Sequence, residues 1–341
     1  IGATVHVFAH AESHGTPDAV FPNNWFGTDC DLSQQTRKRL TLFPMRHPNR
    51  RAERRDDLVR YLKARYSELI DLTPHETSSA SGHPGKFLEG TGAMVLDRIY
   101  KVAYVSLSER ADEGVANVWC VAHGYGLQTF NAKDTQGRPI YHTNVMMSVG
   151  TRGAILCRPS LSDDEYAAVA RGLTETGRKI IDIDFAQMGN MCGNVLEVKG
   201  RNGTLCLLMS TNAFDSFSET QLAEINSAWD SVAVASIPTI EEIGGGGILK
   251  EKPWRRSHGG ETMEEKSWRI NPGGIWGQKH PGVTQNVRFA DWHFLSACSG
   301  FRRVTLKKCL SGRRQLLLLW CSTAWGVEAF ASAPVLGGWS A

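Results

Sequence analysis

The segment Glu89–Asp97 reads EGTGAMVLD, continues after a turn as Lys101–Ser108 (KVAYVSLS), and then takes on a helical pattern. The same order returns twice further along the chain. Two strand-like segments precede a helix at Ser162, and two more precede a helix at Ser218. A short apolar strand follows each of those helices. The unit is therefore strand, turn, strand, helix, strand, and it recurs about every 50 residues, as in repeat architectures.

The later copies place their segments at matching positions. Their strands are predicted at Val145–Gly150, Gly153–Cys157, Lys179–Ile183, Asn194–Val198, Thr204–Met209 and Val232–Ala235. Two further pieces fit the unit: a strand at Arg39–Phe43 with a helix around Arg54–Tyr66, and a strand at Ile237–Ile240. Five such units closed into a ring would leave only short outer edges. The sequence thus predicts an α/β fold, a five-bladed pseudo-symmetric ββαβ propeller whose final blade is incomplete.

Two of the predicted helices carry a recognisable start. Ser162 is followed three residues later by Glu165, and Ser218 by Gln221. In such a capping box, the serine hydroxyl and the acid or amide each satisfy a backbone N–H that the first turn leaves free. These pairs fix where the second and third repeats turn from strand into helix.

Charge and tryptophan content change sharply at Ile248. Residues 248–341 carry 14 Lys and Arg against 6 Asp and Glu, and they hold seven of the ten tryptophans. We therefore predict one domain at residues 1–247 and an aberrant, basic, poorly ordered tail at residues 248–341, which leaves the propeller after Gly247. A small appended domain is the alternative, but we favour sequence that no core selected. The strand-like start at Ile1, without methionine, predicts an N-terminally truncated chain.

Composition limits the class of protein. A chain of 341 residues with 41% hydrophobic and 21% charged residues is typical of a soluble globular protein. The sequence has no apolar run of about 18 residues, so we predict a cytoplasmic protein without a membrane partner. The cysteines stand singly in apolar stretches, which favours buried thiols. No two of them have the CxxC spacing that would indicate a metal site. No metal and no cofactor are predicted.

Two basic features have alternative interpretations. The arginines Arg50, Arg51, Arg54 and Arg55 are interleaved with acids, so we predict a solvated helix face rather than a nucleic-acid patch. The net positive tail allows nucleic-acid binding as a weak alternative. We therefore predict no nucleic-acid partner. Homo-oligomerisation is left open.

Four motifs in order carry a resemblance to a known family. They are Asp18–Phe26 (DAVFPNNWF), Phe87–Gly92 (FLEGTG), Tyr141–Gly150 (YHTNVMMSVG) and Cys192–Glu197 (CGNVLE). Together they resemble the citrulline-utilisation hydrolase branch of the pentein superfamily, the arginine-deiminase and amidinotransferase-like proteins. The resemblance spans residues 1 to about 247. It implies a five-bladed α/β propeller with the active site on its axis. It also implies a cofactor-free reaction in which a cysteine thiolate attacks a guanidino or ureido carbon and water releases the product.

The resemblance assigns roles to five residues. His142 is the predicted general acid and base, and Glu89 the catalytic carboxylate. Glu89 and Asp29 would accept the fork of donors of a planar cation. Asn23 matches a position that contacts an α-carboxylate, and Asn144 is a further substrate-binding group. Without this context, His142 would be a buried structural histidine, Glu89 a turn acid and Asn23 a turn former.

The sequence departs from the family pattern at three places. Asn144 stands where arginine deiminases carry a carboxylate, which favours a ureido group because an amide both donates and accepts. Asp29 stands where close relatives often carry histidine. The Gly244–Gly247 turn leads into Ile248 and Leu249 rather than into a nucleophilic cysteine. Cys192 is not a substitute, because it stands at the start of the third repeat, where we predict a packed thiol.

Two functions follow from this mixture. The first is a carbon–nitrogen hydrolase for a guanidino or ureido amino acid, citrulline- or arginine-like, that is inactive as written because its thiol is missing. The second is a non-catalytic binder of the same small molecules. Binding without product formation would distinguish the binder from the hydrolase.

Overall fold

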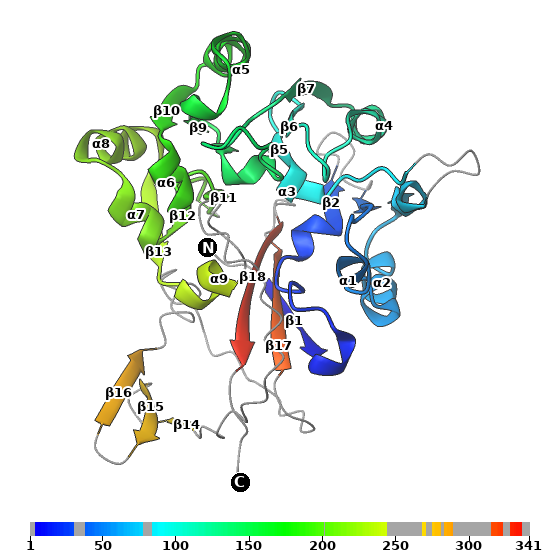
Figure 1. Ribbon diagram of the computed structural model, residues 1–341, viewed down its shortest axis with the longest axis vertical. Helices are drawn as coiled ribbons and strands as arrows, with labels where there is room; N and C mark the ends of the chain where they lie inside the picture. The colour runs from blue at the N-terminus through cyan, green and yellow to red at the C-terminus, as the bar shows by residue number, and fades with distance from the viewer. Residues whose placement is uncertain are drawn as a thin grey trace.

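The computed structural model describes residues 4–30, 38–77, 84–200 and 202–243, together with five strands of the C-terminal region (Figure 1). Those strands are β14 (Trp268–Ile270), β15 (Ile275–His280), β16 (Val283–Arg288), β17 (Gln315–Ser322) and β18 (Glu328–Val335). The predicted boundary at Ile248 and most of the predicted tail lie outside the described residues.

Four three-stranded sheets in the described part of the chain share one topology. In each, the first strand is antiparallel to the middle strand and the third is parallel to it. The sheets contain β2 (Phe26–Cys30), β3 (Lys38–Leu42) and β4 (Glu68–Asp71); β5 (Met94–Asp97), β6 (Val102–Ser106) and β7 (Gly126–Phe130); β8 (Met147–Val149), β9 (Gly153–Cys157) and β10 (Lys179–Ile183); β11 (Leu196–Lys199), β12 (Leu205–Ser210) and β13 (Ser231–Ala235). The repeat read from the sequence is therefore present in four copies.

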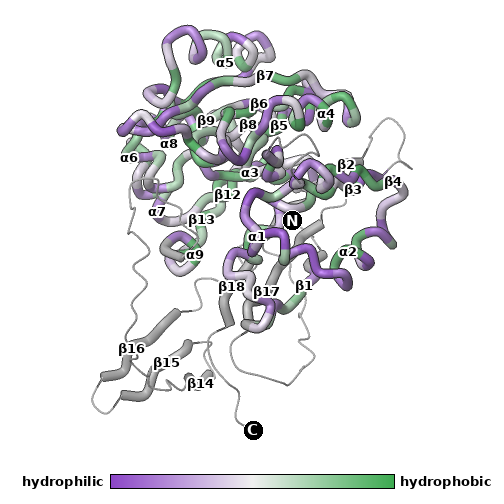
Figure 2. The backbone as a smooth tube through the Cα atoms, turned by 45° about the vertical axis from the view of Figure 1, so that its right-hand side comes forward, coloured by the Kyte–Doolittle hydropathy of each residue, from purple (hydrophilic) through white to green (hydrophobic). Residues whose placement is uncertain are grey.

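A helix connects the second and third strand of every unit, because a parallel pair needs a crossover. These helices are α2 (Asp56–Lys63), α4 (Glu113–His123), α5 (Asp163–Glu175) and α8 (Glu219–Ala228). In Figure 1 the four units follow one another in an arc, with these helices on its outer side. Figure 2 shows hydrophobic segments along β9 and β12, whose side chains are almost all buried, and hydrophilic segments along α8.

The predicted closure into a five-bladed propeller is not confirmed. The N-terminal strand β1 (Thr4–Ala11) pairs antiparallel with β17, and β17 pairs antiparallel with β18. This sheet lacks the parallel pair of the other units. The pairing also brings two strands from beyond Ile248 next to the start of the chain, which the sequence did not predict.

The predicted helix starts at Ser162 and Ser218 are confirmed. Both serine hydroxyls accept the backbone N–H of the residue three positions on, and the side chains of Glu165 and Gln221 accept the backbone N–H of the serines. A third capping box, which the sequence analysis missed, opens the short helix α6 (Phe185–Gly189) with Asp184.

The predicted strand at Ile237–Ile240 is wrong. This segment begins helix α9 (Pro238–Ile243), and the amides of Ile240 and Glu241 both donate to the Ile237 carbonyl at 3.1 Å. Proline is well suited to the first helical turn, because its missing N–H has no partner there anyway. Among the described helices, none has the length and apolar character needed to cross a bilayer.

Candidate active site

Three short helical turns meet where the first three units begin. They are η2 (Pro22–Asn24), α3 (Gly90–Ala93) and η4 (Thr143–Val145), and each directly precedes the first strand of its unit. The turn α3 packs against both of the others. Glu89 and His142 directly precede α3 and η4, while Asn23 and Asn144 lie within the turns η2 and η4. Repetition of the unit therefore brings together residues that are far apart in sequence.

The glycines of the EGTG segment allow this close approach. Gly90 has a φ of +48°, and a Cβ there would lie 2.2 Å from the Asn23 carbonyl oxygen. A Cβ on Gly92 would lie 2.5 Å from Asn24 Oδ1 and 3.0 Å from Nδ1 and Cε1 of His142. A side chain at either position would separate the turns, so packing requires glycine at both, and at Gly90 the backbone conformation favours it as well.

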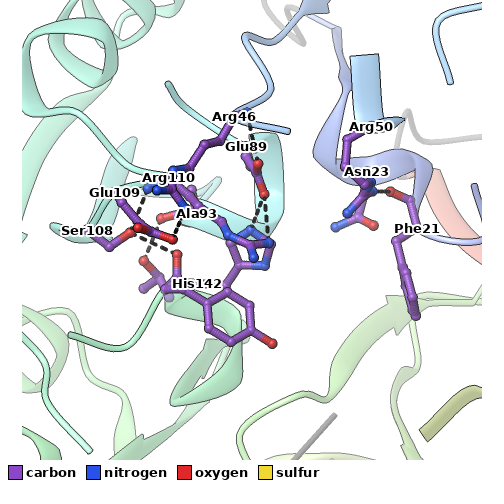
Figure 3. A network of polar contacts seen from close by, with 12 residues as sticks. Phe21, Asn23, Arg46, Arg50, Glu89, Ala93, Ser108, Glu109, Arg110 and His142 are labelled. Atoms are coloured by element: carbon purple, nitrogen blue, oxygen red, sulfur yellow. Dashed lines mark hydrogen bonds and ion pairs between the residues drawn. The ribbon is translucent and has the colours of Figure 1, made fainter. Parts of the chain in front are cut away.

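Glu89 and His142 form a buried pair at the centre of this junction (Figure 3). The Oε2 of Glu89 lies 2.7 Å from the Nε2 of His142. Glu89 is fully buried and His142 is 7% exposed. The other oxygen of Glu89 accepts the backbone N–H of Arg46 at 3.2 Å, and Arg110 Nη1 lies 3.5 Å from Oε2. The structure thus brings together the two predicted catalytic residues.

The electrostatics of the pair define its protonation. Burial favours a protonated Glu89, but the hydrogen bond to His142 and the charges of His142, Arg110 and Arg50 outweigh it and lower the pKa of Glu89 to about 2. Burial also lowers the pKa of His142, against the opposing effect of Glu89. At neutral pH the pair is a carboxylate and a neutral imidazole whose Nε2–H is donated to Glu89. The Nδ1 edge, which faces Gly92, then has a lone pair that can accept a proton.

Arg110 is a site residue that the sequence analysis missed. Its guanidinium lies over the Tyr141 ring, 4.8 Å from the centroid, and its Nε is buried without a partner in the described part of the chain. Ser108 holds the loop by donating to the Tyr141 carbonyl at 2.9 Å and accepting from the Arg110 amide at 3.1 Å. The sheet topology explains why Arg110 lies at the site. Because β6 runs antiparallel to β5, the loop after β6 returns to the end where β5 begins.

The two predicted asparagines lie in the turns η2 and η4, and each has a hydrogen-bond partner outside the pair. Asn23 Nδ2 donates to Thr91 Oγ1 at 3.3 Å, which links η2 to α3. The backbone carbonyl of Asn144 accepts from Asn194 Nδ2 at 3.2 Å. Figure 3 shows Asn23 with Phe21 and Arg50 in a group set apart from Glu89 and His142. The substrate contacts assigned to both asparagines stay predictions.

Asp29 is not brought to the pair. It lies near the far end of β2, where Oδ2 is 3.3 Å from His123 Nδ1 and 3.7 Å from Arg39 Nη1, and Oδ1 is 3.9 Å from Arg98 Nη1. Asp97 ends the equivalent strand β5 and binds Arg178 at 2.8 Å. Both acids therefore bridge neighbouring units at the end opposite the turns. The clamp role predicted for Asp29 stays a prediction.

The arginine-rich segment after β3 is not the solvated face that the sequence predicts. Arg50 is 5% exposed and donates to the Phe21 carbonyl. Arg51 donates to the carbonyls of Met45 and Arg46, and Arg54 forms a two-bonded pair with Glu76. The acidic residues between the arginines suggested that the charges of the segment neutralise one another in solvent. The sequence does not show in which direction each guanidinium points.

Three of the described cysteines are poor nucleophiles. Cys120, Cys157 and Cys192 are buried, and burial raises their pKa to about 11, 12 and 12 respectively. Cys192 lies in the turn before β11 and donates to the Ala213 carbonyl at 3.4 Å. In the part of the chain that the structure describes, no group of three or more His, Cys, Asp or Glu side chains is placed to hold a metal ion.

A family model decides which proteins this chain is related to. The model of eukaryotic N,N dimethylarginine dimethylhydrolase matches residues 1–249. The chain belongs to this family. The predicted membership of the pentein superfamily is confirmed. In this dimethylarginine dimethylhydrolase family member, the matched residues include all four motifs and both residues of the Glu89–His142 pair. No curated protein matches the chain.

Solved structures agree on the fold of this dimethylarginine dimethylhydrolase family member. One is the substrate-bound N-terminal domain of ArgZ, an arginine dihydrolase from cyanobacteria, with 16% identity, a TM-score of 0.50, and coverage of 68% of this chain and 73% of that chain. Another is AgrE in complex with L-arginine, with 16% identity, a TM-score of 0.51, and coverage of 68% and 30%. At this identity the two structures establish a shared mixed α/β fold of small sheets and helices.

Proposed function

We propose that this protein is a carbon–nitrogen hydrolase of the pentein type whose substrate is an arginine-like amino acid, with methylated arginine as the first candidate. The observation that carries the proposal is the buried Glu89–His142 pair with its 2.7 Å hydrogen bond. A ureido amino acid such as citrulline is the second candidate substrate, because Asn144 offers an amide where arginine deiminases carry a carboxylate.

The pair can perform the proton transfers of this reaction. Glu89 holds the Nε2–H of His142 and so fixes the tautomer and the ring orientation. The Nδ1 lone pair can accept the proton of an attacking thiol or water, and the resulting imidazolium can return it to the departing amine. The negative charge of Glu89 stabilises that imidazolium. The attacking cysteine that the family resemblance implies would have to come from outside the described residues.

The neighbouring groups suit an amino-acid substrate. The Nε of Arg110 has no protein partner in the described structure, and the guanidinium lies beside Tyr141, so Arg110 is our proposed anchor for the substrate carboxylate. Asn23 and Asn144 are the proposed orienting amides. The carboxylate of Asp29 is held by His123 and two arginines. The affinity of the Asp29→Asn variant for the amino-acid ligand tests the predicted clamp role, which requires weaker binding.

Calorimetric titration with L-arginine, N,N-dimethyl-L-arginine and L-citrulline tests the proposal, with release of ammonia or dimethylamine measured in parallel. Turnover is expected in a version whose Gly244–Gly247 turn leads into a cysteine, and it should fall at least about 100-fold in His142→Ala. Unchanged turnover in His142→Ala would overturn the mechanism. No heat and no product with any of the three compounds would overturn the function.

A non-catalytic binder is the second candidate function. It is favoured by the three buried cysteines Cys120, Cys157 and Cys192, because burial raises their pKa to about 11 or 12 and none of the three is a thiolate at neutral pH. The binder predicts heat of binding without product in the chain as written. Any amine release by that chain would exclude it.

The proposed architecture is a ring of five units formed by residues 1–247, with residues 248–341 as a further region whose strands β17 and β18 form a sheet with β1. Support comes from the four described units of one topology and from the charge change at Ile248. Limited proteolysis is expected to cut first between Gly247 and Gly260 and to leave the N-terminal part intact. Resistance of the full chain would contradict this division.

A further inference from the structure

The segment between β3 and α2 contacts two of the three turns that form the candidate active site. At Glu89, the Arg46 amide donates to the carboxylate at 3.2 Å, and the Leu88 amide donates to the Pro44 carbonyl at 3.1 Å. At η2, Arg50 reaches the backbone just before Asn23. This segment, residues 44–54, is therefore placed to set the relative position of α3 and η2.

Arg50 makes the contact to η2 from a buried position. Its Nη2 donates to the Phe21 carbonyl at 3.2 Å (Figure 3). The same carbonyl accepts the Asn24 amide at 3.2 Å, so it is also the acceptor that closes the turn containing Asn23. A change in the position of the Phe21 carbonyl would move Asn23 directly.

Glu53 fixes the guanidinium from the other side. Arg50 Nε donates to Glu53 Oε1, and Nη2 lies 3.2 Å from Oε2. Arg50 is 5% exposed and Glu53 is fully buried. A buried ion pair adds little net stability, because removing both charges from water costs about as much as their attraction returns. The two-bonded pair does restrict orientation strongly.

We propose that Arg50, held by Glu53, is a positioning residue that fixes Asn23 relative to Glu89 and His142 and so sets the affinity for the amino-acid ligand. The part concerning ligand affinity rests on the function proposed above. The part concerning the position of η2 does not. The Nε and Nη2 of Arg50 are bonded to Glu53 and to the Phe21 carbonyl, so Arg50 acts on Asn23 through that carbonyl.

The charge of Glu53 makes this arrangement sensitive to pH. Burial raises the pKa of Glu53 to about 7, against the charge and hydrogen bond of Arg50, and the charges of Asp18 and Glu89 act in the same direction as burial. Arg50, Asp18 and Glu89 are the charged groups that face it. Protonation below neutral pH removes the negative partner of Arg50, so the hold on η2 is expected to weaken as the pH falls.

Hydrogen–deuterium exchange of the ligand-free full chain tests the positional part. In Arg50→Gln, the amides of Asn24 and Trp25 are expected to exchange about tenfold faster than in the wild type, because a charge-assisted hydrogen bond is lost beside them. Arg50→Lys keeps the charge next to Glu53 but lacks the fork, so a smaller increase at the same amides is expected. Glu53→Gln should increase exchange there too.

Arg55→Gln is the matched control. Arg55 is four residues from Arg51 in the same basic cluster, but its side chain pairs with Asp57 and does not contact η2 or Glu89 in the described structure. Exchange at Asn24 and Trp25 should stay at the wild-type rate. Equal rates in Arg50→Gln, Arg50→Lys and Arg55→Gln would overturn the proposal. So would a uniform increase over the whole chain, which indicates lost stability instead.

Titration with L-arginine tests the ligand part. The dissociation constant is expected to rise about tenfold in Arg50→Gln and to stay unchanged in Arg55→Gln, and the wild type should bind more weakly at pH 6 than at pH 8. An unchanged constant in Arg50→Gln, with faster exchange at Asn24, would limit Arg50 to a structural role and overturn this part. If the wild type binds none of the three amino acids, the proposed function fails, while the exchange experiment still decides the positional part.

Discussion

Two carboxylate–histidine pairs bridge neighbouring units of this protein, and they differ in what surrounds the histidine. Glu89 and His142 lie 2.7 Å apart where the turns meet, and Asp29 and His123 lie 3.3 Å apart at the opposite end of the sheets. His123 uses its second ring nitrogen as well, at 2.9 Å from Thr41 Oγ1, and its ring stacks on Trp119 at 4.3 Å. In the described residues the Nδ1 of His142 has no such partner.

The difference shows that a carboxylate–histidine pair is not by itself a site. A histidine with both nitrogens bonded and its ring stacked has no lone pair or proton available for a substrate. A histidine with one nitrogen held by a carboxylate and the other facing glycine retains one. The same chemical pair is thus structural in one place and suited to proton transfer in the other. The following substitutions separate the two roles.

Glu89→Gln is expected to have the largest effect. It removes the charge that holds His142 and Arg110 and leaves the arginine without a buried partner. The free energy of unfolding should fall by about 3 kcal/mol, and affinity for L-arginine should fall at least about 100-fold. Urea denaturation followed by tryptophan fluorescence and calorimetric titration measure both. If Glu89→Gln binds as the wild type does, Glu89 is not part of the ligand site.

The pH dependence of stability should come mainly from the same carboxyl. The folded pKa of Glu89 is lowered from 4.5 to about 2, so its contribution is complete above pH 5 and is lost as the pH falls towards 2. The loss amounts to about 3 kcal/mol at 1.36 kcal/mol per pKa unit. The lowered pKa of His142 acts with the same sign, and stability begins to fall below about pH 6.5 as the unfolded histidine protonates.

Urea denaturation from pH 8 to pH 3 measures this dependence. Glu89→Gln should flatten the curve below pH 5, and His142→Gln should flatten it near pH 6. An acid limb as steep as in the wild type would show that other carboxyls dominate. Asp29, whose pKa burial raises but His123, Lys101 and Arg98 lower overall, is the first alternative source.

His123→Ala tests the structural pair. The substitution removes the hydrogen bonds to Asp29 and Thr41 and the stacking on Trp119, so the free energy of unfolding should fall by about 2 to 3 kcal/mol. Affinity for L-arginine should stay within about twofold of the wild type, because His123 does not contact the turns. A loss of affinity for L-arginine in a folded His123→Ala protein would show that both regions belong to one functional site.

Gly92→Ala is expected to have the smallest effect of the four. A Cβ would lie 3.0 Å from the His142 ring and 2.5 Å from Asn24 Oδ1, so the pair must shift, at a cost of about 1 to 2 kcal/mol. Gly172→Ala in α5 is the matched control, because its Cβ would find only contacts of 3.5 Å and should stabilise the helix by about 0.5 kcal/mol. Equal thermal stability of both variants would show that Gly92 does not limit the packing at His142.

The sequence predicted the elements better than their side-chain partners. The capping boxes at Ser162 and Ser218 were correct because every atom involved lies within one helical turn. The strand predicted at Ile237–Ile240 failed because Pro238 suits the first turn of a helix, where its missing N–H needs no partner. The buried arginine Arg50 was placed on the surface because its acceptor, the Phe21 carbonyl, is 29 residues away.

The candidate site divides in the same way. His142 and Glu89 were found from motifs, and the structure joins them across 53 residues of sequence. Arg110 was missed because no local pattern marks a loop that returns to the site only through the antiparallel pairing of β5 and β6. Asp29 was grouped with Glu89 by resemblance, yet its partner His123 lies 94 residues away in the next unit.

The sequence by itself determined the repeated unit and the helix starts, and the resemblance carried by its motifs indicated the two residues of the central pair. Periodicity, capping and glycine requirements act over a few residues and can be read along the chain. Only the tertiary structure decided which arginine is buried, which histidine keeps a free nitrogen and which acid bridges two units. Burial and charge pairing depend on segments that meet only when the units pack, and those meetings determine the pKa of Glu89 and the availability of His142.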